Sequence, residues 1–362
     1  MAERPITQSN TLTATGLNLQ EPLVLLMTTK HLGNLLVSLH CIQVIVKASQ
    51  GQSLLVVDES YRNIIESIND TGKVLYYPRQ QLKTASLTKK ARLLFHFYQH
   101  LRRHQATLLL DFDGQGQAST ITQLSGIKER IGPADAHRCK GVYTQQLADT
   151  GRLSHRFNDY AQYLLSFLGE KPQPQYPQLN NRPRHCHERQ VLLSKHGIDS
   201  TRPYACIHVG ATKAYKLWPA EHYAIIADWL ADRGLQVILI GAEADDANRI
   251  GEVSAKCQHQ HHNLCDQLSI LQLMSLFQQA RFFLGNDSGP MHLAAATGTR
   301  VYAIFGPTDE IRWGPLGNNA TVIRNPVACE SSCSKKLCPV NHRCINTLSV
   351  EQVKAALEQH TF

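Results

Sequence analysis

The chain has 362 residues, of which 43% are hydrophobic and 18% are charged, with 22 glycines and 15 prolines. This composition is typical of a globular protein of about two domains and excludes fibrous, disordered and disulfide-scaffold chains. The longest purely apolar run, residues 23–27, is far shorter than the roughly 20 residues that span a bilayer. The polar residues 1–20 lack the apolar core of a secretory signal. We therefore expect a cytoplasmic protein whose ten cysteines are mostly reduced thiols.

Charge is distributed unevenly along the chain. Residues 1–183 contain 20 Lys and Arg against 13 Asp and Glu, whereas residues 184–362 contain 17 against 16. A basic first half indicates an anionic partner, which could be a phosphorylated lipid, a nucleic acid or a membrane surface. A solvated face that keeps the protein soluble explains the same charge equally well.

Short β-rich runs alternate with longer amphipathic segments. In chain order, the predicted strands are residues 22–28, 53–58, 73–77, 107–113, 204–210, 235–241, 281–285 and 300–306. Helical patterns separate these runs, for example at residues 219–233 and 269–280. Such alternation predicts an α/β protein with two doubly wound domains, each a parallel sheet covered by helices on both faces.

The segment of residues 170–185, EKPQPQYPQLNNRPRH, contains four prolines and predicts an interdomain linker. We expect an N-terminal domain at residues 1–178 and a C-terminal domain at residues 185–345. Residues 346–362 are expected to form a C-terminal helix that could pack back on the N-terminal domain. Because ligands of such sheets bind beyond the carboxyl ends of the strands, a cleft between the domains is the expected site.

The segment of residues 283–307, FLGNDSGPMHLAAATGTRVYAIFGP, runs from a predicted strand through a glycine turn into a helix of small residues. Pro290 suits the first helical turn, and the residues before it leave backbone N–H groups free to face an anion such as a diphosphate. The alternative is a simple tight turn in which Asp287 or Ser288 caps the helix.

A second loop follows the predicted strand that begins at residue 204. Residues 204–219 read YACIHVGATKAYKLWP and place the Thr212 hydroxyl and the Lys216 ammonium after that strand. Facing the glycine turn, these two groups would form a diphosphate clamp. Trp218 is interpreted as a core residue.

From residue 204 to residue 309, the chain resembles glycosyltransferase family 9, the ADP-heptose:lipopolysaccharide heptosyltransferases of Gram-negative bacteria. The segments HVGATKAYKLWPAEHY, GLQVILIGAEAD and the highly specific GNDSGPMHLAAA carry this resemblance. Residues 32–47 more weakly resemble the first glycine loop and helix of the family. The family implies a GT-B fold, two Rossmann-like domains facing a central cleft, with the acceptor on the first and the nucleotide sugar on the second. It also implies an inverting transfer without a divalent metal.

Carried over residue by residue, the resemblance implies that Thr212 and Lys216 contact the donor diphosphate. Asp287 would hold hydroxyls of the transferred sugar, and Glu243 lies where the family binds the adenosine ribose. The expected phosphate turn consists of Ser288, Gly289 and Pro290, with His292 facing the same phosphates. Lys216, His292 and a helix N-terminus can stabilise the negative charge that develops on an ADP leaving group.

One position departs from the family. Its first loop reads Leu-Gly-Asp, and that aspartate is the expected general base on the acceptor hydroxyl. Here the loop ends in Asn34, whose amide cannot accept a proton at neutral pH. Asp113 is the preferred substitute because it follows a first-domain strand, and Asp111 and His31 are the other candidates. An ordinary turn residue before a glycine is the competing interpretation of Asp113.

Four cysteines, Cys329, Cys333, Cys338 and Cys344, lie within sixteen residues. This spacing permits a tetrahedral zinc or iron site. In the related autotransporter-modifying heptosyltransferases a similar cluster binds iron, so a structural metal is a hypothesis here, whereas no catalytic cofactor is expected. Four reduced thiols in a surface loop are the alternative.

Basic residues of the first half are expected to attract a phosphorylated, Kdo-bearing lipid A acceptor at the inner membrane. They are Lys30, Arg62, Lys89, Lys90, Arg102 and Arg103. Residues 89–104 are amphipathic and could rest on the membrane as a peripheral helix, although most of such a stripe is more often the inner face of a packed helix.

The sequence thus predicts an inverting transferase that moves heptose from ADP-L-glycero-D-manno-heptose to the lipopolysaccharide inner core, without a nucleic acid partner. The alternatives are transfer to a protein hydroxyl and a catalytically impaired ADP-sugar-binding protein. Turnover of the donor separates the enzymes from the binding protein.

Overall fold

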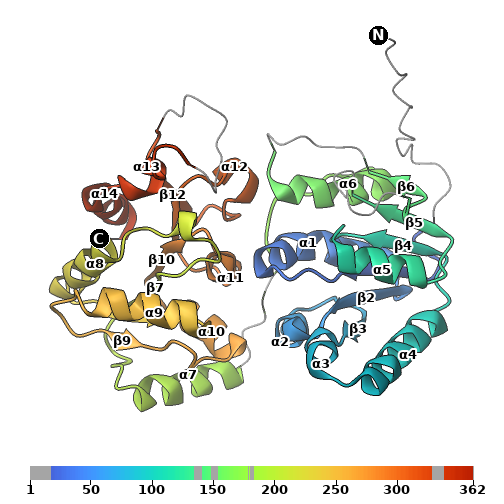
Figure 1. Ribbon diagram of the computed structural model, residues 1–362, viewed down its shortest axis with the longest axis horizontal. Helices are drawn as coiled ribbons and strands as arrows, with labels where there is room; N and C mark the ends of the chain where they lie inside the picture. The colour runs from blue at the N-terminus through green and yellow to red at the C-terminus, as the bar shows by residue number, and fades with distance from the viewer. Residues whose placement is uncertain are drawn as a thin grey trace, which may run out of the picture. The chain divides into compact units, whose positions relative to one another are not determined.

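The computed structural model of the protein describes residues 18–133, 141–147, 154–177, 179, 183–327 and 338–361. The chain divides into two compact units, Met1–Pro174 and Gln175–Phe362, here named the first and the second unit. Each unit is built on a parallel sheet with helices packed against it (Figure 1). Across the described part of the chain, every helix is too short or too polar to cross a membrane.

The first unit alternates strands and helices. In chain order its elements are β1 (Leu23–Met27), α1 (Leu32–Ala48), β2 (Ser53–Asp58), η1 (Glu59–Tyr61), α2 (Arg62–Glu66), β3 (Lys73–Tyr77), α3 (Arg79–Thr84), α4 (Leu87–Arg103), β4 (Leu108–Asp111), α5 (Gly116–Leu124), β5 (Glu129–Gly132), β6 (Gln145–Gln146) and α6 (Arg156–Leu168). Its six-stranded sheet has the order β3-β2-β1-β4-β5-β6.

The second unit repeats this architecture. Its elements are α7 (Pro183–Lys195), β7 (Tyr204–His208), η3 (Ala214–Lys216), α8 (Ala220–Asp232), β8 (Gln236–Ile240), α9 (Glu243–Ser254), β9 (His262–Asn263), α10 (Ile270–Phe277), β10 (Phe282–Asn286), α11 (Gly289–Ala296), β11 (Val301–Phe305), α12 (Glu310–Trp313), β12 (Ala320–Arg324), α13 (Arg343–Asn346) and α14 (Val350–Thr361). Its six-stranded sheet has the order β12-β11-β10-β7-β8-β9.

The central strands are largely hydrophobic because both faces of each sheet are covered. Every residue of β1 is fully buried, as is every residue of β11. All strand pairs run parallel; for example, Leu25 of β1 lies opposite Leu55 of β2 and Leu110 of β4. Parallel strands buried on both faces are the expected state of such apolar runs. The predicted pair of doubly wound α/β domains is confirmed.

The order of each sheet defines where a ligand site is expected. The order in which the chain adds strands to the sheet reverses between β1 and β4 in the first unit and between β7 and β10 in the second, while all of these strands stay parallel. Loops diverge at such switch points, which leaves a crevice beyond the carboxyl ends of the two strands. The residues that follow these four strands are therefore expected to line a ligand site in each unit.

The structure differs from the sequence prediction at some short elements. Strands β5, β6, β9 and β12 were not predicted, since they are edge or near-edge strands without a long apolar run. Helix α7 begins at Pro183, within the segment predicted as a linker, and proline is well tolerated at the first position of a helix.

The C-terminal helix α14 packs within the second unit. It contacts α8 and β12, and Val353 and Leu357 are fully buried in the hydrophobic core that these elements share. Its apolar residues complete the core beside α8.

Candidate functional site

A pocket of about 350 Å³ opens beyond the switch point of the second unit. Strands β7 and β10 pair side by side there, with His208 opposite Gly285. The described lining includes five of the predicted donor-binding residues, and three loops contribute them: Thr212, Glu243, Ser288, Gly289 and Pro290. The topology thus gathers residues that are far apart in sequence at one switch point.

Asn286, the last residue of β10, holds the two main loops of this pocket together. Its side-chain oxygen accepts hydrogen bonds from the Trp218 backbone N–H at 3.2 Å and from the Tyr223 hydroxyl at 3.0 Å. Its amide nitrogen donates to the carbonyl oxygens of Val209 and Gly210 at 3.0 and 3.2 Å. Because every polar group of this fully buried amide is used, the loop after β7 is fixed against the end of β10.

Lys216 and Asp287 form an ion pair beside the pocket. The Lys216 ammonium donates to the Asp287 carboxylate at 2.6 Å, and the two side chains are only 19% and 8% exposed. The described lining of the pocket includes neither residue. The pair therefore joins the loop after β7 to the turn after β10 and holds a positive charge next to that turn.

His292 is buried in α11 and is held by a residue that the sequence analysis missed. The Tyr176 hydroxyl lies 2.6 Å from His292 Nδ1, and the Leu316 N–H donates to the same hydroxyl at 3.2 Å. Either Tyr176 or Nδ1 can be the donor of the bond between them, depending on the tautomer of His292. Burial also raises the pKa of the Tyr176 hydroxyl, which keeps it protonated. Tyr176 was overlooked because it lies in the proline-rich segment predicted as a linker.

In the first unit, Asp111 is buried at the carboxyl end of β4. One carboxylate oxygen accepts hydrogen bonds from the N–H groups of Asp113 and Gly114 at 2.9 and 3.1 Å, and the other accepts from the Tyr143 hydroxyl at 2.5 Å. A Cβ at Gly132 would overlap the Tyr143 ring, so glycine is needed for this approach. Burial raises the pKa of Asp111 to about 6, although the three hydrogen bonds oppose the shift. Asp111 therefore orders the turn after β4.

Asp113 is also buried, with only 3% of the residue exposed. Unlike Asp111, it receives no hydrogen bond of ordinary geometry from a described residue at either carboxylate oxygen. Burial, followed by the nearby Asp111 charge, raises the pKa of Asp113 to about 7, although Arg79, the Thr29 hydroxyl and Arg156 lie close enough to oppose the shift. A buried carboxyl with a raised pKa and no hydrogen bond of ordinary geometry is a feature of functional sites.

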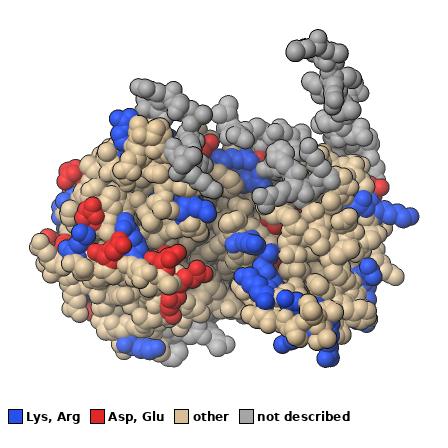
Figure 2. Space-filling model, viewed as in Figure 1, with Lys and Arg blue, Asp and Glu red and all other residues tan. Residues whose placement is uncertain are grey.

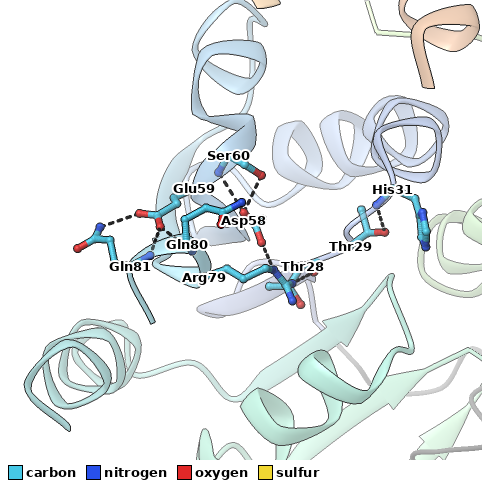
Figure 3. Close-up of polar contacts among 9 residues, drawn as sticks. All are labelled: Thr28, Thr29, His31, Asp58, Glu59, Ser60, Arg79, Gln80 and Gln81. Carbon is cyan, nitrogen blue, oxygen red and sulfur yellow. Dashed lines mark hydrogen bonds and ion pairs between the residues drawn. The ribbon is translucent and has the colours of Figure 1, made fainter. Parts of the chain in front are cut away.

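Arg79, whose charge acts on Asp113, connects the ends of three elements. Figure 3 shows its contacts. Its guanidinium, at the start of α3, donates to the Asp58 carboxylate at the end of β2 and to the Thr28 carbonyl after β1. Asp58 also accepts from the Ser60 N–H at 3.0 Å and the Ser60 hydroxyl at 2.7 Å. This buried network orders the loops at the switch point of the first unit.

We expect Arg79→Ala to lower the free energy of unfolding by about 3–5 kcal/mol, because it leaves the buried Asp58 charge without its cation. Urea unfolding of the variant and the wild type measures this difference. Arg62→Ala is a matched control, since its ion pair with Glu66 is about half exposed and should contribute less than about 1 kcal/mol. Equal losses in the two variants would contradict a structural role for the buried pair.

The remaining predicted residues of the first unit lie around α1. His31 precedes α1 and is exposed; its N–H donates to the Thr29 hydroxyl at 3.1 Å, and its ring lies apart from the Arg79 network (Figure 3). Asn34 is half-buried in the first turn of α1. Of the proposed base candidates, only Asp113 combines burial, a raised pKa and unused acceptor atoms.

The cysteine cluster is partly outside the described residues, where Cys329 and Cys333 lie. Cys338 and Cys344 are half-buried, and the His342 N–H lies 3.3 Å from the Cys338 sulfur. Within the described residues, no three His, Cys, Asp or Glu side chains form a group that could hold a metal ion.

Comparison with known proteins agrees with these features. A family model described as glycosyltransferase family 9 (heptosyltransferase) matches residues 94–343. Lipopolysaccharide heptosyltransferase 3 of Escherichia coli is 25% identical over 262 residues, which are 72% of this chain and 76% of that protein.

Solved structures of similar proteins share the fold. The glycosyl transferase family 9 protein from Veillonella parvula DSM 2008 has a TM-score of 0.82 at 18% identity, covering 96% of this chain and 98% of that one. ADP-heptose lps heptosyltransferase II of E. coli has a TM-score of 0.72 at 20% identity, covering 93% of this chain and 98% of that one. The α/β fold of the GT-B type is confirmed.

Proposed function

Because the chain belongs to glycosyltransferase family 9, the heptosyltransferase family, we propose that it transfers heptose from ADP-L-glycero-D-manno-heptose to the lipopolysaccharide inner core. The acceptor would be a phosphorylated, Kdo-bearing lipid A. The observation that carries this proposal is the pocket of the second unit, where five predicted donor-binding residues meet at one switch point. The names of the relatives support the substrate class, since they include lipopolysaccharide and ADP-heptose.

In this proposal the donor diphosphate lies over the turn that begins α11. The backbone N–H groups of the first turn and the Thr212 hydroxyl would donate to the phosphates, and Lys216 would supply a positive charge beside them. Asp287 would accept hydrogen bonds from sugar hydroxyls.

Glu243 would bind the ribose hydroxyls of the donor. It lies in the pocket lining with a φ of +73°, a conformation that costs a non-glycine residue about 1–3 kcal/mol. The Asp266 carboxylate stabilises this conformation by accepting from the Glu243 N–H at 2.8 Å. Strain of this kind at a pocket supports a binding role.

The proposed reaction is a single displacement with inversion at the anomeric carbon. The acceptor oxygen bonds to that carbon from the face opposite ADP, while the bond from the carbon to the ADP oxygen breaks. The acceptor proton moves to the Asp113 carboxylate, and Lys216 with the α11 N-terminus stabilises the charge on departing ADP. The positive charge in this step comes from Lys216 and the α11 N-terminus, and the step needs no divalent metal.

Product analysis tests the proposal. Incubation with ADP-heptose and Kdo-lipid A is expected to give ADP and an acceptor heavier by one heptose, and nuclear magnetic resonance should show an inverted anomeric configuration. An unchanged lipid together with a heptosylated protein would favour the alternative acceptor, a protein hydroxyl. A donor that binds and never turns over would favour an impaired binding protein, the reading that Asn34 suggests.

We also propose that the first unit contacts an anionic membrane surface through α4. This helix contains no acidic residue, and Leu87 and Phe95 are 84% and 64% exposed. Beside Phe95 lies a groove of about 690 Å³ whose lining includes Arg102 and Arg103. Figure 2 shows basic side chains gathered on the visible face of the first unit. Exposed apolar side chains next to basic ones suit a lipid surface.

Changing Lys89, Arg92 and Arg103 to Gln should weaken binding to phosphatidylglycerol vesicles by roughly 1 kcal/mol for each charge removed. Co-sedimentation measures this change. The matched control replaces Lys47, Lys73 and Lys128, which are also exposed basic residues of the first unit, by Gln. Equal binding by the two triple variants would show that general charge, and not α4, controls vesicle binding.

A structural zinc or iron ion at the four cysteines remains a proposal. Elemental analysis of protein purified under reducing conditions is expected to find about one metal ion per chain, and Cys338→Ser with Cys344→Ser should remove it. Because the site is structural, metal loss should lower thermal stability more than donor affinity. Metal-free wild-type protein of normal stability would contradict the proposal.

A further inference from the structure

Three polar side chains form a continuous chain along one wall of the pocket. Ser288 Oγ lies 3.1 Å from His208 Nδ1, and His208 Nε2 lies 3.3 Å from the Asp246 carboxylate. These residues come from the turn after β10, the end of β7 and the first turn of α9, and all three line the pocket. Neither His208 nor Asp246 was predicted from the sequence to have a role.

The surrounding backbone is shaped to hold Asp246 in place. A Cβ at Gly210 would overlap the Asp246 carboxylate, and a Cβ at Gly241 would lie 2.7 Å from the Asp246 Cβ. Neither glycine has a positive φ, so space and not conformation requires them. The Ala242 N–H donates to the same carboxylate at 2.8 Å. Partial burial by itself would raise the pKa of Asp246. The hydrogen bonds from His208 and Ala242 outweigh this effect and lower the pKa, which keeps the carboxylate ionised.

The side chain of Ser288 does not cap α11. It occupies the N-cap position of α11, where a serine side chain normally accepts a hydrogen bond from a backbone N–H of the first turn. Here the side chain makes no such bond. The hydroxyl instead contacts His208, which leaves the helix N-terminus for another acceptor.

The protonation state of His208 decides what the Ser288 hydroxyl can do. An ionised Asp246 only accepts, so a neutral His208 places its proton on Nε2, and Nδ1 then accepts the Ser288 proton. A phosphate in the pocket would face only the lone pairs of that hydroxyl. When His208 is protonated, both ring nitrogens donate, the Ser288 oxygen accepts from Nδ1, and the Ser288 O–H is free to donate to a phosphate oxygen.

The charges of the pocket favour the protonated state once an anion binds. Apart from His208, the ionisable residues of the described lining are all acidic and all lie on α9: Glu243, Asp245 and Asp246. The lining contributed by α10 and α11 is uncharged, through Ile270, Leu273, Gly289 and Pro290. Beside the lining, Lys216 is paired with Asp287 at 2.6 Å, so its charge is partly neutralised. An anionic diphosphate in this lining would therefore gain from a positive charge at His208.

We propose that His208 and Asp246 are positioning residues: binding of a nucleoside diphosphate favours the protonated form of His208, which takes its proton from solvent, and Ser288 turns its hydroxyl to a phosphate oxygen. No covalent bond of the ligand changes in this step. The inference rests on the proposed function, because it concerns the same donor pocket.

Titration calorimetry with ADP-heptose, without acceptor, tests the inference. Measured at about pH 7 in two buffers that differ in ionisation enthalpy, the wild type is expected to take up a fraction of a proton per nucleotide bound, about half for a tenfold coupling. The diphosphate diester of the sugar nucleotide does not titrate in this range, so the proton must go to the protein. In His208→Gln the uptake should vanish, and affinity at about pH 7 should fall roughly tenfold for loss of one charge-assisted hydrogen bond.

Two further variants keep the test decisive even if His208→Gln is unstable. Asp246→Asn should move the proton uptake to lower pH, because the carboxylate no longer favours the charged ring. His259→Gln is the matched control, since His259 lies 2.9 Å from Asp232 in a similar His–Asp pair outside the pocket lining, and it should behave as wild type.

The outcomes are distinct. Nucleotide binding without proton uptake in the wild type, or uptake that persists in His208→Gln, would overturn the positioning role while leaving the proposed donor intact. Absence of any ADP-heptose binding by the folded wild type would overturn the proposed function, and this inference with it.

Discussion

Asp113→Asn is expected to lower kcat for heptose transfer by about 10²- to 10⁴-fold, the usual contribution of a general base. The amide keeps the shape of the carboxyl but cannot take the acceptor proton. An assay of ADP release with saturating ADP-heptose and acceptor measures the loss. Asp70→Asn, an exposed change of the same kind in the first unit, should leave kcat unchanged.

The pH profile gives this prediction a second readout. Because the pKa of Asp113 is raised to about 7, its basic form increases as pH rises through that value. The wild-type rate should therefore rise across this range and level off above it. A profile that is flat between about pH 6 and 8, together with full activity of Asp113→Asn, would exclude Asp113 as the base.

The same substitution should also change stability. A carboxyl whose pKa is higher in the folded than in the unfolded state lowers the unfolding free energy as pH rises from about 4 to 7, on the order of 4 kcal/mol in total for Asp113. Below about pH 4 the effect disappears because both states are protonated. The buried amide of Asp113→Asn would itself lack hydrogen-bond partners, which offsets part of this difference. The variant should therefore have an unfolding free energy higher than that of the wild type by about 1–3 kcal/mol at pH 8. This gain in stability should be smaller at pH 5.

Lys216→Ala is the second substitution with a large expected effect. Removing the cation beside the α11 turn should weaken ADP binding and lower kcat, together by about 10²- to 10³-fold in kcat/KM, because charge develops on ADP as it leaves. Steady-state kinetics and calorimetry with ADP measure the two parts.

The ion pair with Asp287 complicates this substitution, and a double-mutant cycle resolves it. Lys216→Ala leaves a mostly buried Asp287 carboxylate unpaired, so part of any loss could reflect a disordered turn. In an Asp287→Asn background that cost is absent. Lys216→Ala should still weaken ADP binding there; an effect that vanishes in this background would reduce Lys216 to a structural partner.

Much of the fold followed from local patterns. Runs such as Leu23–Met27 and Val301–Phe305 are apolar throughout, and only strands buried on both faces need that pattern. The turn from β10 into α11 was visible for a different reason, since Pro290 has a fixed φ that suits the first turn of a helix. Short edge strands such as β6 and β9 lack these signals.

Contacts between distant residues were not predictable from one sequence. Asp246 lies 38 positions from His208, and Tyr143 lies 32 positions from Asp111; neither pair has a sequence spacing that marks it. The only signals were indirect ones, glycines at 132, 210 and 241 that make room for the partner side chains. Such glycines become meaningful only when the fold brings the side chain to them.

The most direct test of the account is ADP release from ADP-heptose by the wild-type protein, measured with and without Kdo-lipid A. The account predicts release that depends on the acceptor and yields one ADP for each heptose transferred. Tight donor binding with no acceptor-dependent release would contradict it and would identify Asn34 as the mark of a chain that retains the pocket without the reaction.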